Sequence, residues 1–66
     1  MMTNRIEISP AIMMGKPVIR STRITVELIL NKVAEGETES EILEDYPHLT
    51  ADDIHAAIAY GAANAN

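Results

Sequence analysis

The spacing of apolar residues divides the chain into a short extended part and a longer helical part. Apolar and charged residues alternate from Arg5 to Ile8, which predicts a short strand with one apolar face. A second strand is predicted at Val18–Arg20, because β-branched residues favour extended backbone. Between them, the apolar run Ala11–Met14 predicts one helical turn that Gly15 stops.

Helical periodicity begins after Thr25. The first helix is predicted at Val26–Glu35, the second at Glu39–Asp45 and the third at Ala51–Ala62. Each follows a threonine that can cap it, and an acidic residue three positions later completes a capping box in the second and third. Gly36 is the expected end of the first helix. The core-facing stripes are expected to contain Val26, Ile29, Leu30, Val33 and Ala34 in the first helix, and Ile54, Ala57, Ile58 and Gly61 in the third.

The second and third predicted helices are joined by residues 46–50, a spacing close to that of a helix-turn-helix. The expected fold class is therefore mainly α: a three-helix bundle with a helix-turn-helix corner, preceded by a short β-hairpin or strand pair. Residues 1–66 are expected to form a single small domain, with strands and turns at 1–24, helices at 25–62 and a frayed tail at 63–66.

Composition limits how stable such a domain can be alone. The chain has 66 residues and no Cys, Phe or Trp, so its core must consist of Ile, Leu, Val, Met and Ala. A chain of this length buries a limited share of its surface, and it lacks disulfides or a Cys-based zinc site. We expect a partner or a second copy to complete the core, and Met13 and Met14 to fill gaps in the core or an interface.

The sequence contains no apolar run long enough for a membrane span, and Met1–Arg5 lacks the apolar core of a signal peptide. No membrane partner is therefore expected, and the cytoplasm is the default compartment.

The net charge of −5 hides an asymmetry between the two halves. Residues 1–34 contain all five basic residues and only two acidic ones, whereas residues 35–66 contain eight acidic residues and no Lys or Arg. Such a split indicates two functional faces of opposite charge. Acidic residues also enrich solvated helix surfaces and first turns, so the acidic half has a purely structural interpretation as well.

Several stretches of this sequence resemble a known family. The resemblance to the family called domain of unknown function 433 covers about Ile6 to Tyr60, although the family usually has Gly where this chain has Met14 and Ser21. It implies a homeodomain-like helix-turn-helix fold. It also implies a role as the antitoxin of a toxin–antitoxin pair, with a PIN-like ribonuclease as the usual partner. The stretches that carry it are Ile8–Pro10, Gly15–Arg20, Thr22–Val26 and Glu41–Thr50.

Enzymatic chemistry finds little support in the sequence. There is no Cys, the serines have no neighbouring His, and the paired carboxylates fall at helix-capping positions. His48, Asp52 and His55 are the conceivable metal ligands, but Asp52 and His55 are more simply an exposed i, i+3 pair. We therefore expect no enzymatic activity, no metal and no cofactor.

The third helix lacks the residues of an ordinary recognition helix. It begins with two carboxylates and has no Arg, Lys, Gln or Asn before Asn64, although such residues are the usual readers of bases. If the chain binds DNA, we expect an arm or a β-ribbon to make the contact and a homodimer to double it. The residues expected to contact DNA are Arg5, Lys16, Arg20 and Arg23. Alternatively, Arg20 and Arg23 neutralise acidic helices, in which case they should be buried against Glu41, Glu44 or Asp45.

The acidic helical half would suit a basic, RNA-binding protein. Its expected apolar anchors are Leu43, Tyr46, Leu49 and Tyr60, although the two tyrosines could also be the largest members of a core without Phe. The expected function is an antitoxin-like component that binds and neutralises a PIN-like ribonuclease toxin, with operator DNA as a further ligand of a dimer. The alternative is a small structural or adaptor domain with no nucleic-acid role.

Overall fold

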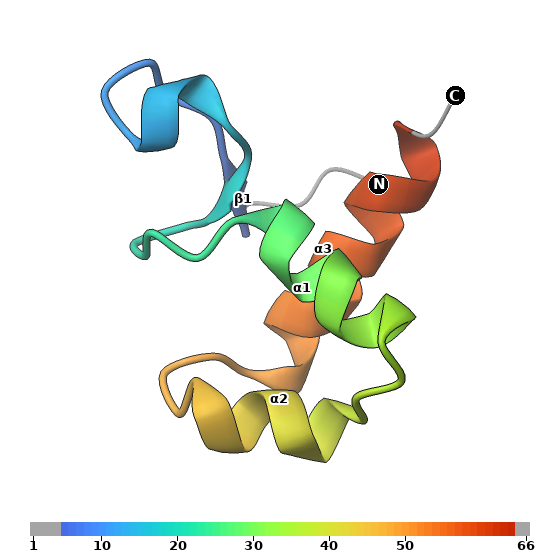
Figure 1. Ribbon diagram of the computed structural model, residues 1–66. Coiled ribbons are helices and arrows are strands. Elements are labelled where there is room, and N and C mark those ends of the chain that lie inside the picture. Colours follow the sequence, from blue (N-terminus) through green and yellow to red (C-terminus); the bar gives the residue numbers. More distant parts are fainter. Residues whose placement is uncertain (1–4, 65–66) are drawn as a thin grey trace.

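Three helices and a two-stranded sheet make up the computed structural model, which describes residues 5–64 (Figure 1). The mainly helical fold predicted from the sequence, with a strand pair at its N-terminal end, is confirmed. The second helix has its predicted bounds, the first is one residue shorter and the third one residue longer. In chain order the elements are β1 (Ile6–Glu7), the 3₁₀ turn η1 (Met13–Gly15), β2 (Val18–Ile19), α1 (Val26–Ala34), α2 (Glu39–Asp45) and α3 (Ala51–Ala63).

Threonine caps explain why the helices begin where the sequence predicts. The hydroxyl of Thr25 accepts a hydrogen bond from the Leu28 amide of α1 at 3.0 Å. Both capping boxes are present, Thr38 with Glu41 in α2 and Thr50 with Asp53 in α3.

The C-terminal ends of α1 and α3 are also fixed by hydrogen bonds. Gly36 ends α1 with a φ of 93°, and the amides of Gly36 and Glu37 donate to the carbonyls of Val33 and Lys32, as in a Schellman motif. Asn64 closes α3 by donating to the Tyr60 carbonyl from both its backbone and its side chain. Residue 63 is therefore helical and not part of a frayed tail, whereas residues 65 and 66 lie outside the described part of the chain.

The core forms where α1 crosses α3 and α2 packs against both helices (Figure 1). The close crossing depends on Gly61, because a Cβ atom there would lie 2.6 Å from Cδ1 of Leu30. The stripes predicted for the two helices extend too far: Val33 and Ile58 are each 39% exposed, because they lie beyond the region that the other elements cover. The buried core cluster consists of Ile19, Val26, Ile29, Ile42, Leu49, Ile54 and Ala57.

The two strands pair within one chain and are antiparallel, with Ile6 opposite Ile19 and Glu7 opposite Val18. On its other side Val18 forms a bridge to Thr25, which joins the hairpin to the start of α1. The side chains of Val18 and Ile19 are buried, so the sheet closes one end of the helical core.

The turn η1 differs from the helical turn predicted for this segment. Its backbone is left-handed, with φ values of 48° at Met13, 57° at Met14 and 87° at Gly15. Neither methionine fills the core, since Met13 is 39% and Met14 94% exposed. Ser21 has a φ of 68°, so both positions where the resembled family usually has Gly require a conformation that glycine adopts without steric cost.

Candidate interaction surfaces

The structure brings only part of the basic set predicted for DNA binding together. Arg5 and Arg20 are opposite each other where the two strands pair, and the Arg20 amide donates to the Arg5 carbonyl at 2.7 Å. Arg5 is a structural tie between the N-terminal segment and α3: its Nη1 donates to Oδ1 of Asp53 at 3.0 Å, and its Nη2 lies 3.5 Å from Oδ2 of Asp52. Asp53 is buried, and its other oxygen accepts from the Thr50 amide. The Arg5 guanidinium is therefore engaged by carboxylates of its own chain.

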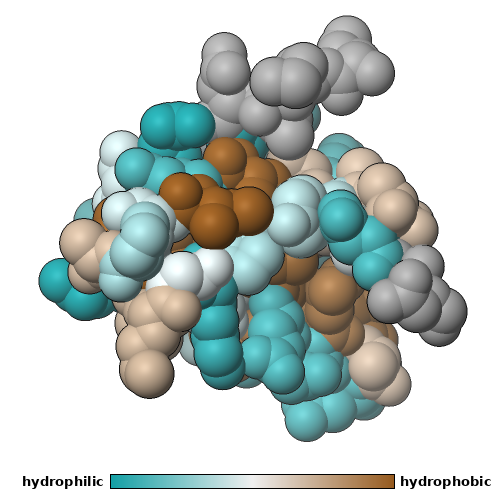
Figure 2. All heavy atoms as spheres, turned by 90° about the horizontal axis from the view of Figure 1, so that it is seen from above, coloured by the Kyte–Doolittle hydropathy of each residue, from teal (hydrophilic) through white to brown (hydrophobic). Residues whose placement is uncertain are grey.

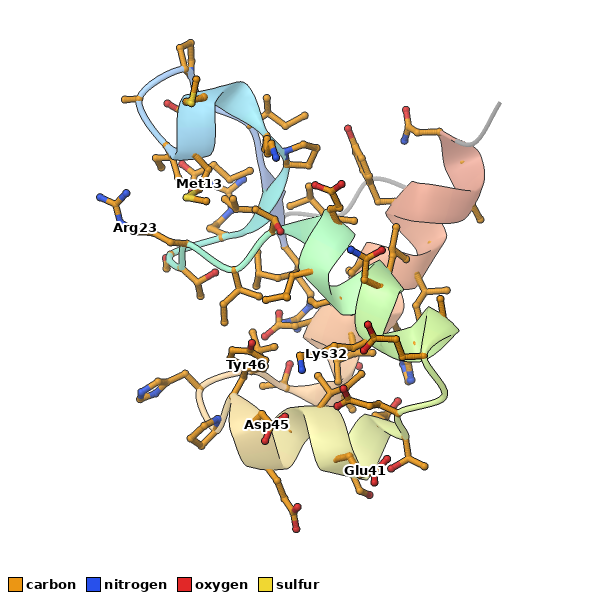
Figure 3. All side chains as sticks on the ribbon, in the orientation of Figure 1. Met13, Arg23, Lys32, Glu41, Asp45 and Tyr46 are labelled. Atoms are coloured by element: carbon orange, nitrogen blue, oxygen red, sulfur yellow. The ribbon has the colours of Figure 1, made fainter. Side chains whose placement is uncertain are left out.

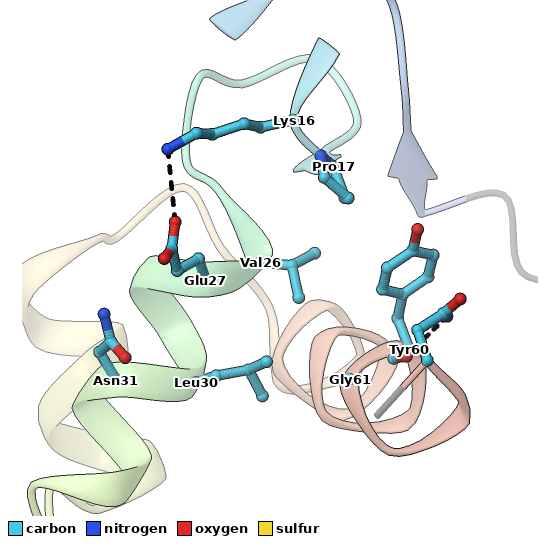
Figure 4. A pocket seen from close by; sticks show the side chains of 9 residues that line it. Lys16, Pro17, Val26, Glu27, Leu30, Asn31, Tyr60 and Gly61 are labelled. Atoms are coloured by element: carbon cyan, nitrogen blue, oxygen red, sulfur yellow. Dashed lines mark hydrogen bonds and ion pairs between the residues drawn. The ribbon is translucent and has the colours of Figure 1, made fainter. Parts of the chain in front are cut away.

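Lys16 lies on another side of the molecule, beside α1. Its Nζ is 3.4 Å from Oε1 of Glu27, and both side chains are well exposed (Figure 4). Exposed pairs of this kind contribute little to stability. Lys16 could therefore exchange Glu27 for another anion at small cost.

Arg20 and Arg23 follow β2 in a tight loop, and both are exposed. Ser21, Thr22 and Arg23 line a hollow of about 340 Å³ together with Glu7 and Ile12. Within residues 5–64, Arg23 forms no ion pair with an acidic side chain. The loop is thus a solvent-facing cationic surface.

Neither arginine lies buried against the acidic residues of α2. Arg23 points outward at the end of the molecule that carries η1, whereas Glu41 and Asp45 lie on α2 at the opposite end (Figure 3). The arrangement in which these arginines are buried against the acidic helix is therefore not the one in this fold.

The acidic end is centred on α2, whose four acidic side chains are all exposed. Three of them have partners in the fold: Glu41 in its capping box, Glu39 with His55 at 2.7 Å, and Asp45 with Lys32 at 3.6 Å. Glu44 makes no such contact with any described residue. Its carboxylate is the one on α2 that a partner could bind without breaking an existing interaction.

A cluster around Lys32, which was not predicted from the sequence, joins α1 to α2. Lys32 Nζ lies 3.2 Å from Oε2 of Glu37 and 5.6 Å from the ring centroid of Tyr46. The hydrogen bond to Glu37, together with the nearby Asp45 carboxylate, raises the pKa of Lys32 above its ordinary value. The chain folds back between the two helices, so no helical spacing in the sequence indicates this cluster.

The four apolar anchors predicted for a partner protein are also distributed over several places. Leu49 belongs to the buried core, and Leu43, Tyr46 and Tyr60 are half-buried against that core. Tyr46 lies at the joint between α1 and α2 beside Lys32 (Figure 3). These positions leave Leu43 and Tyr46 as the predicted anchors near the acidic end.

Tyr60 lies on a hollow of about 360 Å³ between α1 and α3 (Figure 4). Apolar groups of Pro17, Val26, Leu30 and Gly61 line it, and Lys16 and Glu27 lie at its edge. The small residue Gly61 and the side chain of Leu30 meet at its floor, so the hollow follows from the close helix crossing.

The segment between β1 and β2 has three exposed apolar side chains. They are Ile8, Met13 and Met14, which are 57%, 39% and 94% exposed. Seen from above, the end that carries η1 shows hydrophobic residues at its surface beside hydrophilic ones (Figure 2). Of the two roles predicted for Met13 and Met14, a place in the core is excluded by their exposure, and a place in an interface stays a prediction.

The residues considered as metal ligands lie in separate places. Asp52 pairs with Arg5, His55 pairs with Glu39, and His48 is exposed in the turn before α3. Among residues 5–64 no group of His, Asp or Glu side chains could hold a metal ion. No helix in this part of the chain combines the length and apolarity needed to cross a membrane.

Comparison with known proteins gives a consistent assignment. Residues 6–61 match the family described as "Protein of unknown function (DUF433)". Over 56 residues the chain is 41% identical to "Uncharacterized protein y4eO" from Sinorhizobium fredii (strain NBRC 101917 / NGR234), which covers 85% of this chain and 25% of that protein.

A solved structure, the crystal structure of a DUF433 member protein from Anabaena variabilis ATCC 29413, superposes with a TM-score of 0.88 at 39% identity. The match covers 92% of this chain and 60% of that one. The chain thus spans a quarter of one relative and three fifths of the other. Together these matches show that the chain belongs to the DUF433 family.

Proposed function

We propose that this domain is an antitoxin-like binding module that holds a basic ribonuclease of the PIN-like class at its acidic end and operator DNA at its cationic end. The observation that supports the proposal most is the separation of exposed charge. Exposed Arg20 and Arg23 lie on the loop after β2, while the exposed acidic residues of α2 lie at the opposite end of the molecule (Figure 3). A protein with two such ends can bind two ligands of opposite charge at once.

The acidic end has the chemistry that a basic partner requires. Four exposed carboxylates lie on α2, and Leu43 and Tyr46 provide half-buried apolar contacts close to them. RNA-binding enzymes present basic surfaces to their substrates, so an acidic helix can cover such a surface and exclude the RNA. Glu44 is the acidic side chain best placed for this contact, because the described fold does not use it.

The cationic end supplies two arginines in one loop, and the guanidinium group suits phosphate oxygens. One loop of this kind makes few phosphate contacts. A homodimer would double them, and the small core of a 66-residue chain gives a second reason for a dimer.

One matched pair of variants tests the acidic end. The wild-type domain, Glu44→Lys and Glu27→Lys are each titrated with the product of the gene adjacent to its own. Both substitutions reverse one exposed charge, but Glu27 lies on α1 beside Lys16 and away from α2. We expect Glu44→Lys to weaken the complex strongly and Glu27→Lys to leave it unchanged. Equal loss in both variants would contradict a partner site on α2.

A second candidate function is a structural or adaptor domain without any nucleic-acid ligand. The observation that favours it is that Arg5 and Lys16 already pair with carboxylates of their own chain. Binding of DNA from upstream of the domain's own gene separates the two functions. Salt-sensitive binding that weakens in Arg23→Ala supports the DNA role, and no binding at low salt supports the adaptor.

A further inference from the structure

We propose that the outer edge of β1 is the surface on which two copies of this chain pair, through an antiparallel contact between β1 and the β1 of the second copy. The dimer that the DNA role calls for would thereby have a defined interface and a defined register. The pairing needs neither a ribonuclease nor DNA, so it can be tested apart from the proposed function.

The backbone of β1 has hydrogen-bonding groups that the fold does not use. The Arg20 amide donates to the Arg5 carbonyl at 2.7 Å, across the strand pair. The Ile19 amide instead donates to the Ile24 carbonyl at 2.9 Å, on the side away from β1. Because bonding direction alternates along an antiparallel pair, Ile6, which is opposite Ile19, directs its amide and carbonyl away from β2. Within residues 5–64 neither group of Ile6 forms a hydrogen bond. Such an edge is a template for a further strand.

The charges beside Ile6 favour one register for a second copy. Antiparallel pairing about a two-fold axis at Ile6 places Arg5 opposite Glu7 of the second copy, and Glu7 opposite Arg5 of the second copy. An axis at Arg5 or at Glu7 would place two like charges directly opposite each other, which is destabilising. The Arg5 guanidinium also holds Asp53, and its five N–H donors suffice for both carboxylates. The sequence Arg5-Ile6-Glu7 is therefore self-complementary about the residue whose backbone groups point outward.

An exposed apolar side chain next to β1 adds a hydrophobic contact to the pairing. Residues two apart in extended chain lie on one face, so Ile8 follows Ile6 on the face that packs against the core. Ile8 is 57% exposed in a single copy. With the axis at Ile6, Ile8 becomes a diagonal neighbour of Ile6 of the second copy, at a separation that long side chains span. Pairing would therefore bury part of a side chain that one copy leaves in solvent.

A strand of another protein is the other occupant that this edge would accept. The order of the charges favours a second copy, because one two-fold axis satisfies two ion pairs with the same three residues. The size of the chain favours it as well, since a 66-residue chain without cysteine gains stability from association. Because β1 contains only two residues, the dimer should be reversible and should depend on protein concentration.

Disulfide trapping tests the register, because the chain has no cysteine of its own. Arg5→Cys and Glu7→Cys are prepared separately and oxidised alone and as a mixture. With the axis at Ile6, the two substituted positions of a mixed pair face each other with Cα atoms about 4.5 Å apart, within the range of a disulfide. Identical positions in two copies of one variant are about 7–8 Å apart, which is too far. We therefore expect a cross-linked dimer in the mixture and little in either variant alone.

Analytical ultracentrifugation over a range of protein concentration provides a second measurement without cross-links. We expect the wild type to approach twice the mass of one chain. Ile8→Pro should stay monomeric, because proline removes an amide on the outer edge that the described fold does not use. Ile8→Thr is the matched control, since it keeps the amide and a branched side chain, and it should still dimerise. Circular dichroism checks that every variant retains the wild-type helices.

Other results would overturn the inference. Cross-linking of either cysteine variant alone would indicate a different register, and equal cross-linking in all three samples would indicate random collision. A wild type that stays monomeric, but whose complex with the product of the adjacent gene is lost in Ile8→Pro, would assign the edge to that protein. None of these results removes the proposed function, because Glu44→Lys and Arg23→Ala test its two ends separately.

Discussion

The contact between Arg5 and Asp53 gives the sharpest prediction about stability, because it connects residues 48 positions apart in the chain. The Asp53 carboxylate accepts two hydrogen bonds: one oxygen accepts from the Thr50 amide at 3.0 Å, and the other accepts from the Arg5 guanidinium at 3.0 Å. Its side chain is 12% exposed and that of Arg5 45% exposed. Asp53→Ala removes both interactions, whereas Asp53→Asn keeps an oxygen for the Thr50 amide and removes the charge.

The expected losses in the free energy of unfolding follow from these two hydrogen bonds. Loss of the capping interaction costs about 1 kcal/mol. Loss of the charged hydrogen bond costs about 1 kcal/mol, at the low end for its class because water reaches nearly half of Arg5. We therefore expect Asp53→Ala to lower the free energy of unfolding by about 2 kcal/mol and the melting temperature by roughly 8–16 °C. Asp53→Asn and Arg5→Gln should each cost about 1 kcal/mol.

Urea unfolding followed by circular dichroism provides the assay, with Arg5→Gln, Asp53→Ala and the double variant forming a cycle. We expect a coupling energy of about 1 kcal/mol between the two positions. If the single effects add to within about 0.3 kcal/mol, the two residues do not stabilise each other. Arg5→Gln also separates the structural role of Arg5 from a role as a DNA contact. If Arg5 acts only through its ion pair with Asp53, this variant should leave the salt dependence of DNA binding almost unchanged.

Three further predictions concern the turns, the helix crossing and the Lys32 cluster. Ser21→Gly should stabilise the domain by about 0.5–1 kcal/mol in thermal unfolding, because it relieves a φ of 68°, and an unchanged melting temperature would contradict strain there. Gly61→Ala gains about 1 kcal/mol of helix propensity but forces the Leu30 side chain to move, so in the wild-type background it should stabilise the domain by clearly less than that amount or destabilise it. In a Leu30→Ala background the same substitution should give the full gain, and equal effects in both backgrounds would refute the close crossing. The hydrogen bond to Glu37 raises the pKa of Lys32. The difference in stability between the wild type and Lys32→Gln should therefore be complete below pH 10.5, the ordinary pKa of lysine, and should be lost as the pH rises through the raised pKa. A difference that disappears between about pH 6 and 8 would contradict this.

The helices could be predicted from the sequence because their boundaries are set locally. Thr25, Thr38 and Thr50 each accept a hydrogen bond within the next three residues, and Gly36 ends α1 through its own left-handed backbone. Such signals do not depend on the rest of the fold. They therefore fixed the helix bounds to within one residue.

The features that were missed depend on contacts between distant residues or on unusual backbone. Arg5 was predicted as a DNA contact because its charge is visible in the sequence, but the nearness of Asp53 is not. The apolar stripes were extended to Val33 and Ile58 because periodicity does not tell where a neighbouring helix ends. Met14 was predicted to fill a gap in the core or an interface, and its 94% exposure excludes the core, because the left-handed backbone of the turn directs its side chain into solvent.

The central claim is that two opposite ends of one domain bind two ligands, and simultaneous binding tests it most directly. The product of the adjacent gene is added to a preformed complex of the domain with upstream DNA, and the mass of the assembly is measured by light scattering. We predict a ternary complex, from which Arg23→Ala loses only the DNA and Glu44→Lys only the protein partner. Displacement of the DNA by the protein, or the loss of both ligands through either substitution, would contradict the claim.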